Sequence, residues 1–347
     1  MKLADSGAIF CSNVLQSEIK GKTMNEFRLL SSVSNNPYFN LAAESCMVDS
    51  DSGVYFFLWM NAPTVVIGYN QNPFSECDLD KMRQKNVFLA RRRTGGGAVF
   101  HDVGNLNFSF VMPHELYDVK RQSLVICNAL KSLGIDAEIS GRNDLLADGR
   151  KFSGNAYYKG KTHRLHHGTI MLNVDFNALS GYLTPDPSKY LKKGVSSVRS
   201  RVVNLCELKP ELTIQELKIA LFSAFRKEYG VGENVKVENI ANEPTYNALA
   251  KEISSDEYLY KKWQDFSCDT AADFSWGHVK ACVKTNGGKI EQVIFSTDGL
   301  FPAAVDFAEK YLSACGGSVA EKPTFPESFT EDDKKVFFDL TDLIIRR

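Results

Sequence analysis

The sequence RRRTGGGAVFHD, residues 91–102, is the stretch around which the rest of the chain is organised. It lies between two short apolar runs, Asn86–Ala90 and Leu106–Met112, which are both predicted to be strands. Three consecutive glycines allow a sharp bend or the close approach of another group. Three adjacent guanidinium groups match carboxylate or phosphate oxygens. Two interpretations stay open here: a β-hairpin with a flexible basic tip, and a loop that cradles a small anionic ligand.

The composition is that of an ordinary globular protein without a global charge preference. The 347 residues include 41 basic and 42 acidic side chains, a formal net charge of −1, so an anion site has to be local. No apolar run approaches the length of a membrane span. The eight cysteines form no CxxC pair, which favours buried thiols in a reduced compartment over a disulfide framework. We expect a cytoplasmic protein.

Hydrophobic periodicity outside the glycine stretch predicts a succession of short strands and helices, as in an α/β protein. Residues 1–23 contain Asp5 and Glu18 and are interpreted as an N-terminal extension rather than a targeting peptide. A large domain is expected over 24–245, a polar linker over 246–262 and a small α+β domain over 263–347. The clearest helix is 212–229, which begins with the capping box Thr213–Glu216.

Lys151 is the second candidate site. It follows the hairpin turn Asp148-Gly149 on a strand, and alternation predicts that Lys151, Ser153 and Asn155 share one polar face. That face suits solvent as well as a ligand. Upstream, Asn143-Asp144 is either an Asx turn or a position that holds Mg²⁺ on a phosphate.

The remaining polar clusters are weaker signals. His166 and His167 are neighbours on a predicted strand and point to opposite faces, so a shared zinc ion is not expected. The segment 194–204 is either a basic surface loop or a loop that covers phosphate. The chain has no P-loop, no GxGxxG after a strand and no GxSxG elbow. If the protein binds ATP, it does so by another route.

Several motifs taken together resemble the lipoate–protein ligase family. In chain order they are FLWMNAPTVVIG, QNPFSEC, RRRTGGGAVFHD, GRND, DGRKFSGNA, HHGTIML and SSVRSRVVNL. The resemblance runs from about Phe27 to Tyr229 and continues more weakly through a small C-terminal domain like that of long bacterial ligases. It implies the fold shared with biotin protein ligases: a large α/β domain of mixed sheets with an accessory domain.

The resemblance also implies a two-step reaction. Lipoate attacks the α-phosphate of ATP to give lipoyl-adenylate and pyrophosphate, and an acceptor lysine then takes the lipoyl group and releases AMP. The implied acceptors are the lipoyl domains of 2-oxoacid dehydrogenase E2 subunits and the glycine-cleavage H protein. A monomer that binds neither nucleic acid nor membrane is expected.

Individual residues acquire roles from the same resemblance. Lys151 matches the catalytic lysine, which also contacts the adenylate and lipoate. Arg91 and His167 are also implied in binding lipoate, and Val65 and Val66 in lining the tunnel for its chain. Asp144 matches the position that binds Mg²⁺, which is held through ATP. The residues implied in binding ATP or lipoyl-adenylate are Arg91, Arg92, Gly95, Gly96, Gly97, Ala98, Val99, Phe100, Asn143, Lys151, Ser196, Ser197 and Arg199.

Two departures and two rival functions complete the sequence-based picture. Tyr69 and Tyr158 stand where many family members have arginine, which leaves open how the carboxylate is positioned and how the acceptor docks. The first rival is a lipoyl or octanoyl transferase that uses a preformed acyl donor in place of ATP; the GRND and DGRK motifs favour the ligase. The second is a nucleic-acid binder using Arg91–Arg93, which the net charge of −1 disfavours.

Overall fold

The computed structural model describes residues 26–141, 144–184, 201–264, 266, 268–286, 289–316 and 323–345. Contacts divide the chain into two compact units. Unit 1 comprises Met1–Asn61, Val103–Val174 and Val198–Ala250, and unit 2 comprises Ala62–Asp102, Asp175–Ser197 and Lys251–Arg347. The glycine stretch therefore groups with the C-terminal residues, and Lys151 belongs to the other unit. The N-terminal extension 1–23 lies outside the described residues.

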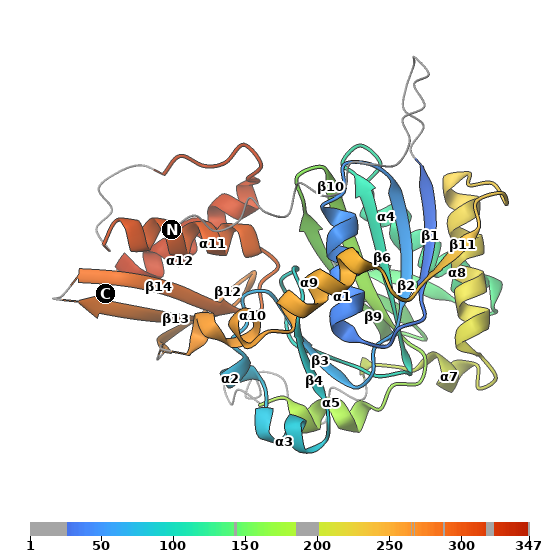
Figure 1. The fold of residues 1–347 in the computed structure, drawn as a ribbon, viewed down its shortest axis with the longest axis horizontal. Helices are drawn as coiled ribbons and strands as arrows, with labels where there is room; N and C mark the ends of the chain where they lie inside the picture. Colours follow the sequence, from blue (N-terminus) through green and yellow to red (C-terminus); the bar gives the residue numbers. More distant parts are fainter. Residues whose placement is uncertain are drawn as a thin grey trace, which may run out of the picture. The chain divides into compact units, whose positions relative to one another are not determined.

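Unit 1 is built on one eight-stranded mixed sheet (Figure 1). The strand order is β11-β1-β2-β6-β10-β9-β8-β7; β11, β1 and β2 are parallel and the remaining neighbours antiparallel. The strands are β1 Phe27–Ser32, β2 Val54–Trp59, β6 Asn105–Pro113, β7 Ala137–Ser140, β8 Asp144–Ala147, β9 Arg150–Lys159, β10 His163–Met171 and β11 Val237–Ile240. The predicted α/β class with mixed sheets is confirmed.

Helices cover both faces of this sheet (Figure 1). Helices α4 (Val119–Ser132) and α8 (Ile214–Tyr229) pack on one face, where Phe56, Phe108, Phe110 and Phe225 form the centre of the apolar core. Helix α1 (Pro37–Val48) contacts β2, β6 and β10 through the opposite face. The short helix α7 (Leu205–Leu208) follows Val202, which forms an isolated β-bridge with Lys151.

The signals at the ends of α8 act as the sequence predicts. Thr213 and Glu216 form the reciprocal capping box, and Gly230 ends the helix in the left-handed conformation with φ 67°. The Asp148-Gly149 turn likewise has positive φ at both residues, 52° and 67°, as a tight two-residue hairpin turn requires.

Unit 2 contains two three-stranded sheets. The first has the order β4-β3-β5, with β3 Thr64–Ile67, β4 Phe88–Arg91 and β5 Val99–His101, and packs with α3 Leu79–Gln84 and α5 Phe176–Tyr182. The short helix α2 spans Pro73–Glu76. The second has the order β12-β13-β14, with β12 Cys268–Phe274, β13 Gly277–Asn286 and β14 Lys289–Thr297, and is covered by α11 Pro302–Ala314 and α12 Glu331–Ile345.

Residues 246–262, predicted to be a linker, are largely helical. They contain most of α9 (Pro244–Ile253), all of α10 (Asp256–Tyr260) and part of the 3₁₀ turn η3 (Lys261–Trp263). Polar side chains dominate this stretch because all of it except Ala250, Ile253 and Leu259 is exposed or half-buried, which is why composition alone suggested a connection. The division into domains at this point stays a prediction.

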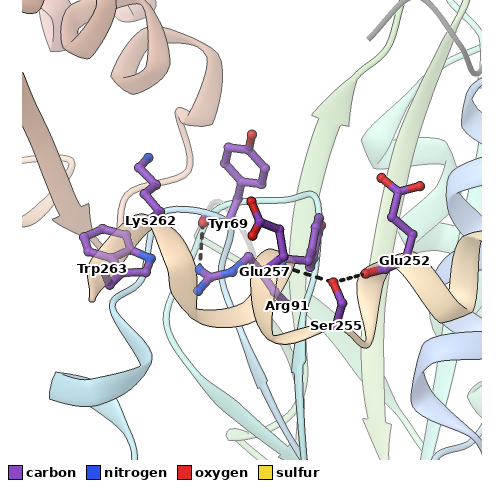
Figure 2. Close-up of a pocket in the computed structure, with 8 residues that line it drawn as sticks. Tyr69, Arg91, Glu252, Ser255, Glu257, Lys262 and Trp263 are labelled. Atoms are coloured by element: carbon purple, nitrogen blue, oxygen red, sulfur yellow. Dashed lines mark hydrogen bonds between the residues drawn. The ribbon is translucent and has the colours of Figure 1, made fainter. Parts of the chain in front are cut away.

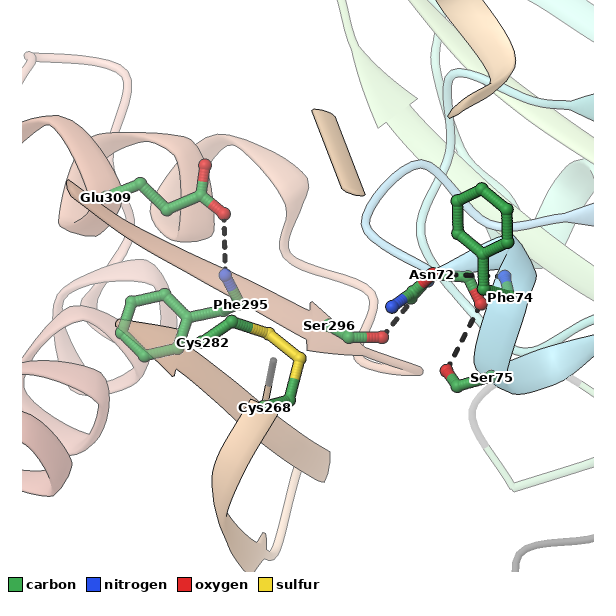
Figure 3. Close-up of a disulfide and its surroundings, with 8 residues drawn as sticks. All are labelled: Asn72, Phe74, Ser75, Cys268, Cys282, Phe295, Ser296 and Glu309. Carbon is green, nitrogen blue, oxygen red and sulfur yellow. Dashed lines mark hydrogen bonds between the residues drawn. A yellow bond between two sulfur atoms is a disulfide. The ribbon is translucent and has the colours of Figure 1, made fainter. Parts of the chain in front are cut away.

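One cysteine pair departs from the expectation of free thiols. Cys268 and Cys282 face each other across β12 and β13 and form a disulfide (Figure 3). Pairing across strands cannot be recognised from a spacing of 14 residues, because it depends on sheet register. Among the described residues the free cysteines are Cys46, Cys77, Cys127, Cys206 and Cys315. No described helix is long and apolar enough to cross a membrane.

Candidate functional site

A β-bulge determines where Lys151 points. In the pairing of β8 with β9, Leu145 faces Ser153 but Leu146 faces Lys151, so Phe152 is an extra residue without a partner. Phe152 is fully buried in the core beneath α4 and α8. Lys151 lies on the other face, where the Cβ of a residue at Gly154 would come within 3.1 Å of the Lys151 ammonium.

The prediction that Lys151, Ser153 and Asn155 share one face is therefore wrong. The bulge inserts one residue, which reverses the alternation between Lys151 and the residues that follow. Asn155 faces the core side, next to His166, and Ser153 is fully buried. Lys151 instead shares its face with Asp144 and Gly154.

Lys151 is held at both its backbone and its side chain. Its carbonyl oxygen accepts a hydrogen bond of 2.9 Å from the N–H of Val203. Its ammonium nitrogen lies 2.7 Å from Oδ1 of Asp144, and both side chains are about one-third exposed, 34% and 37%. A partly exposed cation paired with one carboxylate can also contact solvent or a ligand.

The histidine pair is divided between the two faces, as predicted. His166 is completely buried on the core side, and burial lowers the pKa of its imidazole to about 3, with a further contribution from His167. His167 lies on the opposite face, where its Nδ1 is 2.9 Å from Oε1 of Glu44. Only His167 therefore shares a sheet face with Lys151.

Glu44 connects His167 to a buried polar cluster that the sequence did not reveal. Its Oε1 also accepts a hydrogen bond of 2.5 Å from Ser109, and Ser109 accepts one of 2.9 Å from the Trp59 indole. Glu44 is 2% exposed. A glutamate among the apolar residues of a mostly buried helix was the available signal, because a carboxylate is rarely buried without partners.

Arg91 lies in a different environment from the one predicted for it. Its guanidinium is 5% exposed and donates to the carbonyl oxygens of Tyr69 (2.9 Å), Gln71 (2.7 Å) and Leu259 (2.8 Å). Burial lowers its pKa to about 10. In this structure Arg91 ties the loop after β3 to the last turn of α10, so ligand binding through Arg91 stays a prediction.

Arg92 shapes the glycine stretch. Its guanidinium donates to the carbonyl oxygens of Val66, Gly95 and Gly97 at 3.1, 2.8 and 2.8 Å. The bend it holds depends on glycine at Gly96, whose φ is +95°.

The glycines also permit a close contact within unit 2. A Cβ at Gly95 would lie 2.3 Å from the carbonyl oxygen of Gly299, and the N–H of Gly96 donates to that same oxygen at 3.0 Å. At Gly97 the nearest atom to such a Cβ is 3.9 Å away. The prediction that the glycines admit a close neighbour is confirmed for the backbone at Gly299; a ligand there remains untested.

Val99 and Phe100 belong to strand β5, which the sequence did not predict. Val65 pairs with Phe100, and both pack into the core of the β3–β5 sheet. Val66 pairs with Val99, and alternation places these two on the other face. Of the two valines assigned to the lipoyl tunnel, Val65 is thus committed to this core, and Val66 remains a candidate.

A pocket of about 280 Å³ opens beside Arg91 within unit 2 (Figure 2). Its lining combines three aromatic rings with charged groups: Tyr69, Arg91, Glu252, Ser255, Glu257, Tyr258, Lys262 and Trp263. Burial, with Asp306 nearby, raises the pKa of Tyr69. The tyrosine that replaces the family's arginine is thus a neutral wall of this pocket.

Several implied site residues lie outside the described part of the chain: Asn143, Ser196, Ser197 and Arg199. For Mg²⁺, Asp144 is the one described candidate named by the sequence, and no described group of three or more His, Cys, Asp or Glu side chains forms a metal cage. A single carboxylate fits Mg²⁺ only in the mode where substrate phosphates supply further ligands. Asp144 fits that mode, in competition with its pairing to Lys151.

Comparison with known proteins gives consistent matches over most of the chain. The family model described as "Lipoyl protein ligase A/B catalytic domain" matches residues 36–226. A lipoate-protein ligase A of Psychrobacter cryohalolentis is 38% identical over 299 residues, which cover 83% of this chain and 88% of that relative.

Two crystal structures are similar in fold. That of P. falciparum LipL1 in complex with lipoate has a TM-score of 0.77 at 27% identity and covers 92% of this chain and 100% of that one. That of a lipoate-protein ligase A bound with ATP has a TM-score of 0.56 at 27% identity and covers 70% and 98%. The motifs, the mixed sheet and these matches agree: the chain belongs to the lipoyl protein ligase A/B family.

Proposed function

We propose that Lys151 is the catalytic residue with which this protein, a lipoate–protein ligase, activates lipoate as lipoyl-adenylate and joins it to a lysine of an acceptor protein. The observation that carries this proposal is the ion pair of Lys151 with Asp144, 2.7 Å apart and partly exposed, on the sheet face shared with His167. A fixed, accessible cation on this face can meet a carboxylate and a phosphate together.

The chemistry assigned to Lys151 is electrostatic. As a lipoate oxygen attacks the α-phosphorus and pyrophosphate leaves, negative charge develops on the phosphate oxygens, and a positioned ammonium stabilises it. The same cation stabilises the carbonyl oxygen when the acceptor amine attacks and AMP leaves. Mg²⁺ bound through ATP would supply additional charge neutralisation, with Asp144 as its protein ligand.

We also propose that the glycine stretch binds ATP or lipoyl-adenylate. It belongs to unit 2, whereas Lys151 belongs to unit 1. The proposed binding is supported by the motif order and by a backbone at Gly95–Gly97 that accommodates a close neighbour. The residues proposed alongside them are Asn143, Ser196, Ser197 and Arg199.

Acceptors and compartment follow from the resemblance. We assign the acceptor to the lipoyl domains of 2-oxoacid dehydrogenase E2 subunits or to the glycine-cleavage H protein, and the reaction to the cytoplasm. A protein acceptor is consistent with the name of the Psychrobacter cryohalolentis relative, a lipoate-protein ligase A.

Lipoate-dependent exchange of label between pyrophosphate and ATP tests the first step directly. The wild-type protein should catalyse exchange only when lipoate is present, and Lys151→Ala should abolish it. Failure of the wild-type protein to exchange, together with transfer from supplied lipoyl-AMP, would favour the ATP-independent transferase. Full exchange by Lys151→Ala would remove Lys151 from the mechanism.

A further inference from the structure

A buried hydrogen-bonded trio lies on the core side of the strand that carries Lys151. His166 on β10 contacts two amides, with Nδ1 2.9 Å from Oε1 of Gln122 on α4 and Nε2 3.1 Å from Oδ1 of Asn155 on β9. The exposed fractions of Gln122, His166 and Asn155 are 0%, 0% and 7%. Three polar side chains of three elements are therefore joined where an apolar core would otherwise be expected.

The imidazole of His166, which bridges Gln122 and Asn155, is neutral. Burial keeps His166 uncharged, and a neutral ring donates through one nitrogen and accepts through the other. One of the two amides must therefore turn its NH₂ group, in place of its oxygen, toward the ring. Aromatic rings enclose the imidazole, with Tyr157 at 5.0 Å and Phe108 at 5.5 Å between ring centroids.

The position of Asn155 along β9 gives this bridge its importance. In the described part of the chain, the pairing of β9 with β10 ends at Asn155–Gly168. Beyond that pair β9 turns into the bulge that carries Lys151. The hydrogen bond between Asn155 and His166 therefore fixes β9 to β10 at the last residue of β9 that pairs with β10.

The absence of a side chain at Gly168 leaves the space that the amide of Asn155 occupies. A Cβ at Gly168 would lie 2.5 Å from Oδ1 of Asn155 and 2.7 Å from the Phe108 ring. Any larger residue at Gly168 would displace the amide from His166. On the other face of the neighbouring strand β9, Gly154 leaves room for the Lys151 ammonium, whose nitrogen would lie 3.1 Å from a Cβ at that position.

We propose that Gln122, His166 and Asn155 are positioning residues for Lys151: they pin β9 to β10 and α4 at the end of its ladder and so fix the bulge that presents Lys151 to Asp144. The inference rests on the catalytic role proposed for Lys151. None of the three side chains takes part in the reaction itself. They act through the backbone of β9 and lie on the opposite face from the reacting groups.

The decisive variants remove the hydrogen bonds of the bridge, and His166→Phe does so while a ring still fills the space. His166→Phe retains a ring among aromatic neighbours but lacks both hydrogen bonds, His166→Gln can restore one of them, and Asn155→Ala removes the pin at β9. Ile170→Val is the matched control, because Ile170 is also fully buried on β10 in the same core. Thermal unfolding establishes that each variant is folded.

We expect His166→Phe and Asn155→Ala to lower kcat of lipoate-dependent exchange about 10- to 100-fold, the range for residues that orient a catalytic group, with KM for ATP within about threefold. His166→Gln should recover part of this loss. The double variant His166→Phe/Asn155→Ala should be no slower than the slower of the two single variants. Ile170→Val should leave kcat unchanged.

A second readout does not depend on activity. The rate at which an acylating reagent modifies the Lys151 amine, followed by mass spectrometry, should rise in His166→Phe and Asn155→Ala. It should also rise in Asp144→Asn, where the ion pair is broken directly. A folded His166→Phe with wild-type kcat and wild-type labelling of Lys151 would overturn the proposal. If the wild-type enzyme shows no exchange, the catalytic proposal fails and the labelling still tests the positioning. Should His166→Phe fail to fold, Asn155→Ala decides in both assays.

Discussion

At the scale of single residues, the ion pair of Lys151 and Asp144 is the one to which the proposed chemistry is assigned. Their separation of 2.7 Å means that each partner orients the other. Replacing Lys151 by alanine should lower the rate of lipoyl-adenylate formation by at least about 10²-fold, the usual cost of one preorganised charge-stabilising donor. The measurement is single-turnover formation of lipoyl-adenylate. Asp144→Asn, which keeps the shape of the carboxylate, should give a smaller loss, and equal activity of Lys151→Ala and wild type would contradict the assignment.

His166 predicts a pH dependence of stability at the same scale. Its pKa is about 3 when folded against 6.5 for an ordinary imidazole. Between these values the unfolded chain binds a proton that the folded protein does not, so the stabilising contribution is complete above pH 6.5 and is lost as the pH falls toward 3. His167 is the titratable neighbour that lowers this pKa further, and Tyr157 is the other titratable group in ring contact.

The difference between wild type and His166→Phe isolates this contribution from that of the carboxylates. On going from pH 7 to about pH 4.5, the wild-type free energy of unfolding should fall by roughly 2–3 kcal/mol more than that of the variant. Urea unfolding at the two pH values measures it. Identical pH dependence in both proteins would show that His166 is not buried in its neutral form.

At the scale of elements, the glycine stretch predicts a sharp contrast between neighbours. Gly95→Ala places a methyl group 2.3 Å from the Gly299 carbonyl oxygen, whereas at Gly97 the nearest atom is 3.9 Å away. Neither position has a positive φ, so backbone strain is not the difference. We expect Gly95→Ala to cost about 1–3 kcal/mol, as overpacking does. Thermal or urea unfolding measures the cost, and Gly97→Ala should stay within about 0.5 kcal/mol of wild type.

The disulfide between β12 and β13 belongs to the same scale. It closes a loop with a sequence separation of 14 and lies in a small core with Trp263 and Ile294. Cys268→Ala should lower the stability of the β12–β14 sheet by about 3 kcal/mol, the value expected for a loop of this length. Urea unfolding under oxidising conditions measures the effect. The loss should match that of the reduced wild-type protein, and a larger loss on reduction would point to another cross-link.

At the scale of the whole molecule, unit 2 joins segments far apart in the sequence. Strand β14 holds the loop after β3 through hydrogen bonds from Asn72 N–H to Ser296 Oγ (3.1 Å; Figure 3) and from Thr297 N–H to the Asn70 carbonyl (3.0 Å). Gly96 donates to Gly299 in the same region. Removing residues 263–347 should therefore accelerate hydrogen exchange in residues 68–97. The amides of β6 and α4 in unit 1 serve as the internal reference, and unchanged exchange in residues 68–97 would contradict these contacts.

Much of the fold follows from local signals. The capping box at Thr213, the turn at Asp148-Gly149 and the two faces of the His166-His167 pair were predicted because each depends only on residues close in sequence. Strands β5, β7, β11 and β12 were not predicted, since three of them have only three or four residues and all lean on neighbours distant in the chain.

The sequence by itself determined the family and the order of its motifs, because residue types and spacing carry that information, and it singled out Lys151 as the predicted catalytic residue. Only the tertiary structure decided which way Lys151 points, since one extra residue in the β9 bulge reverses a face and leaves no mark in composition. It also decided the surroundings of RRRTGGGAVFHD. Arg91 and Arg92 are buried and donate hydrogen bonds to main-chain carbonyl oxygens. These acceptors lie in segments as distant as Val66 and Leu259, so the sequence near the arginines does not reveal them.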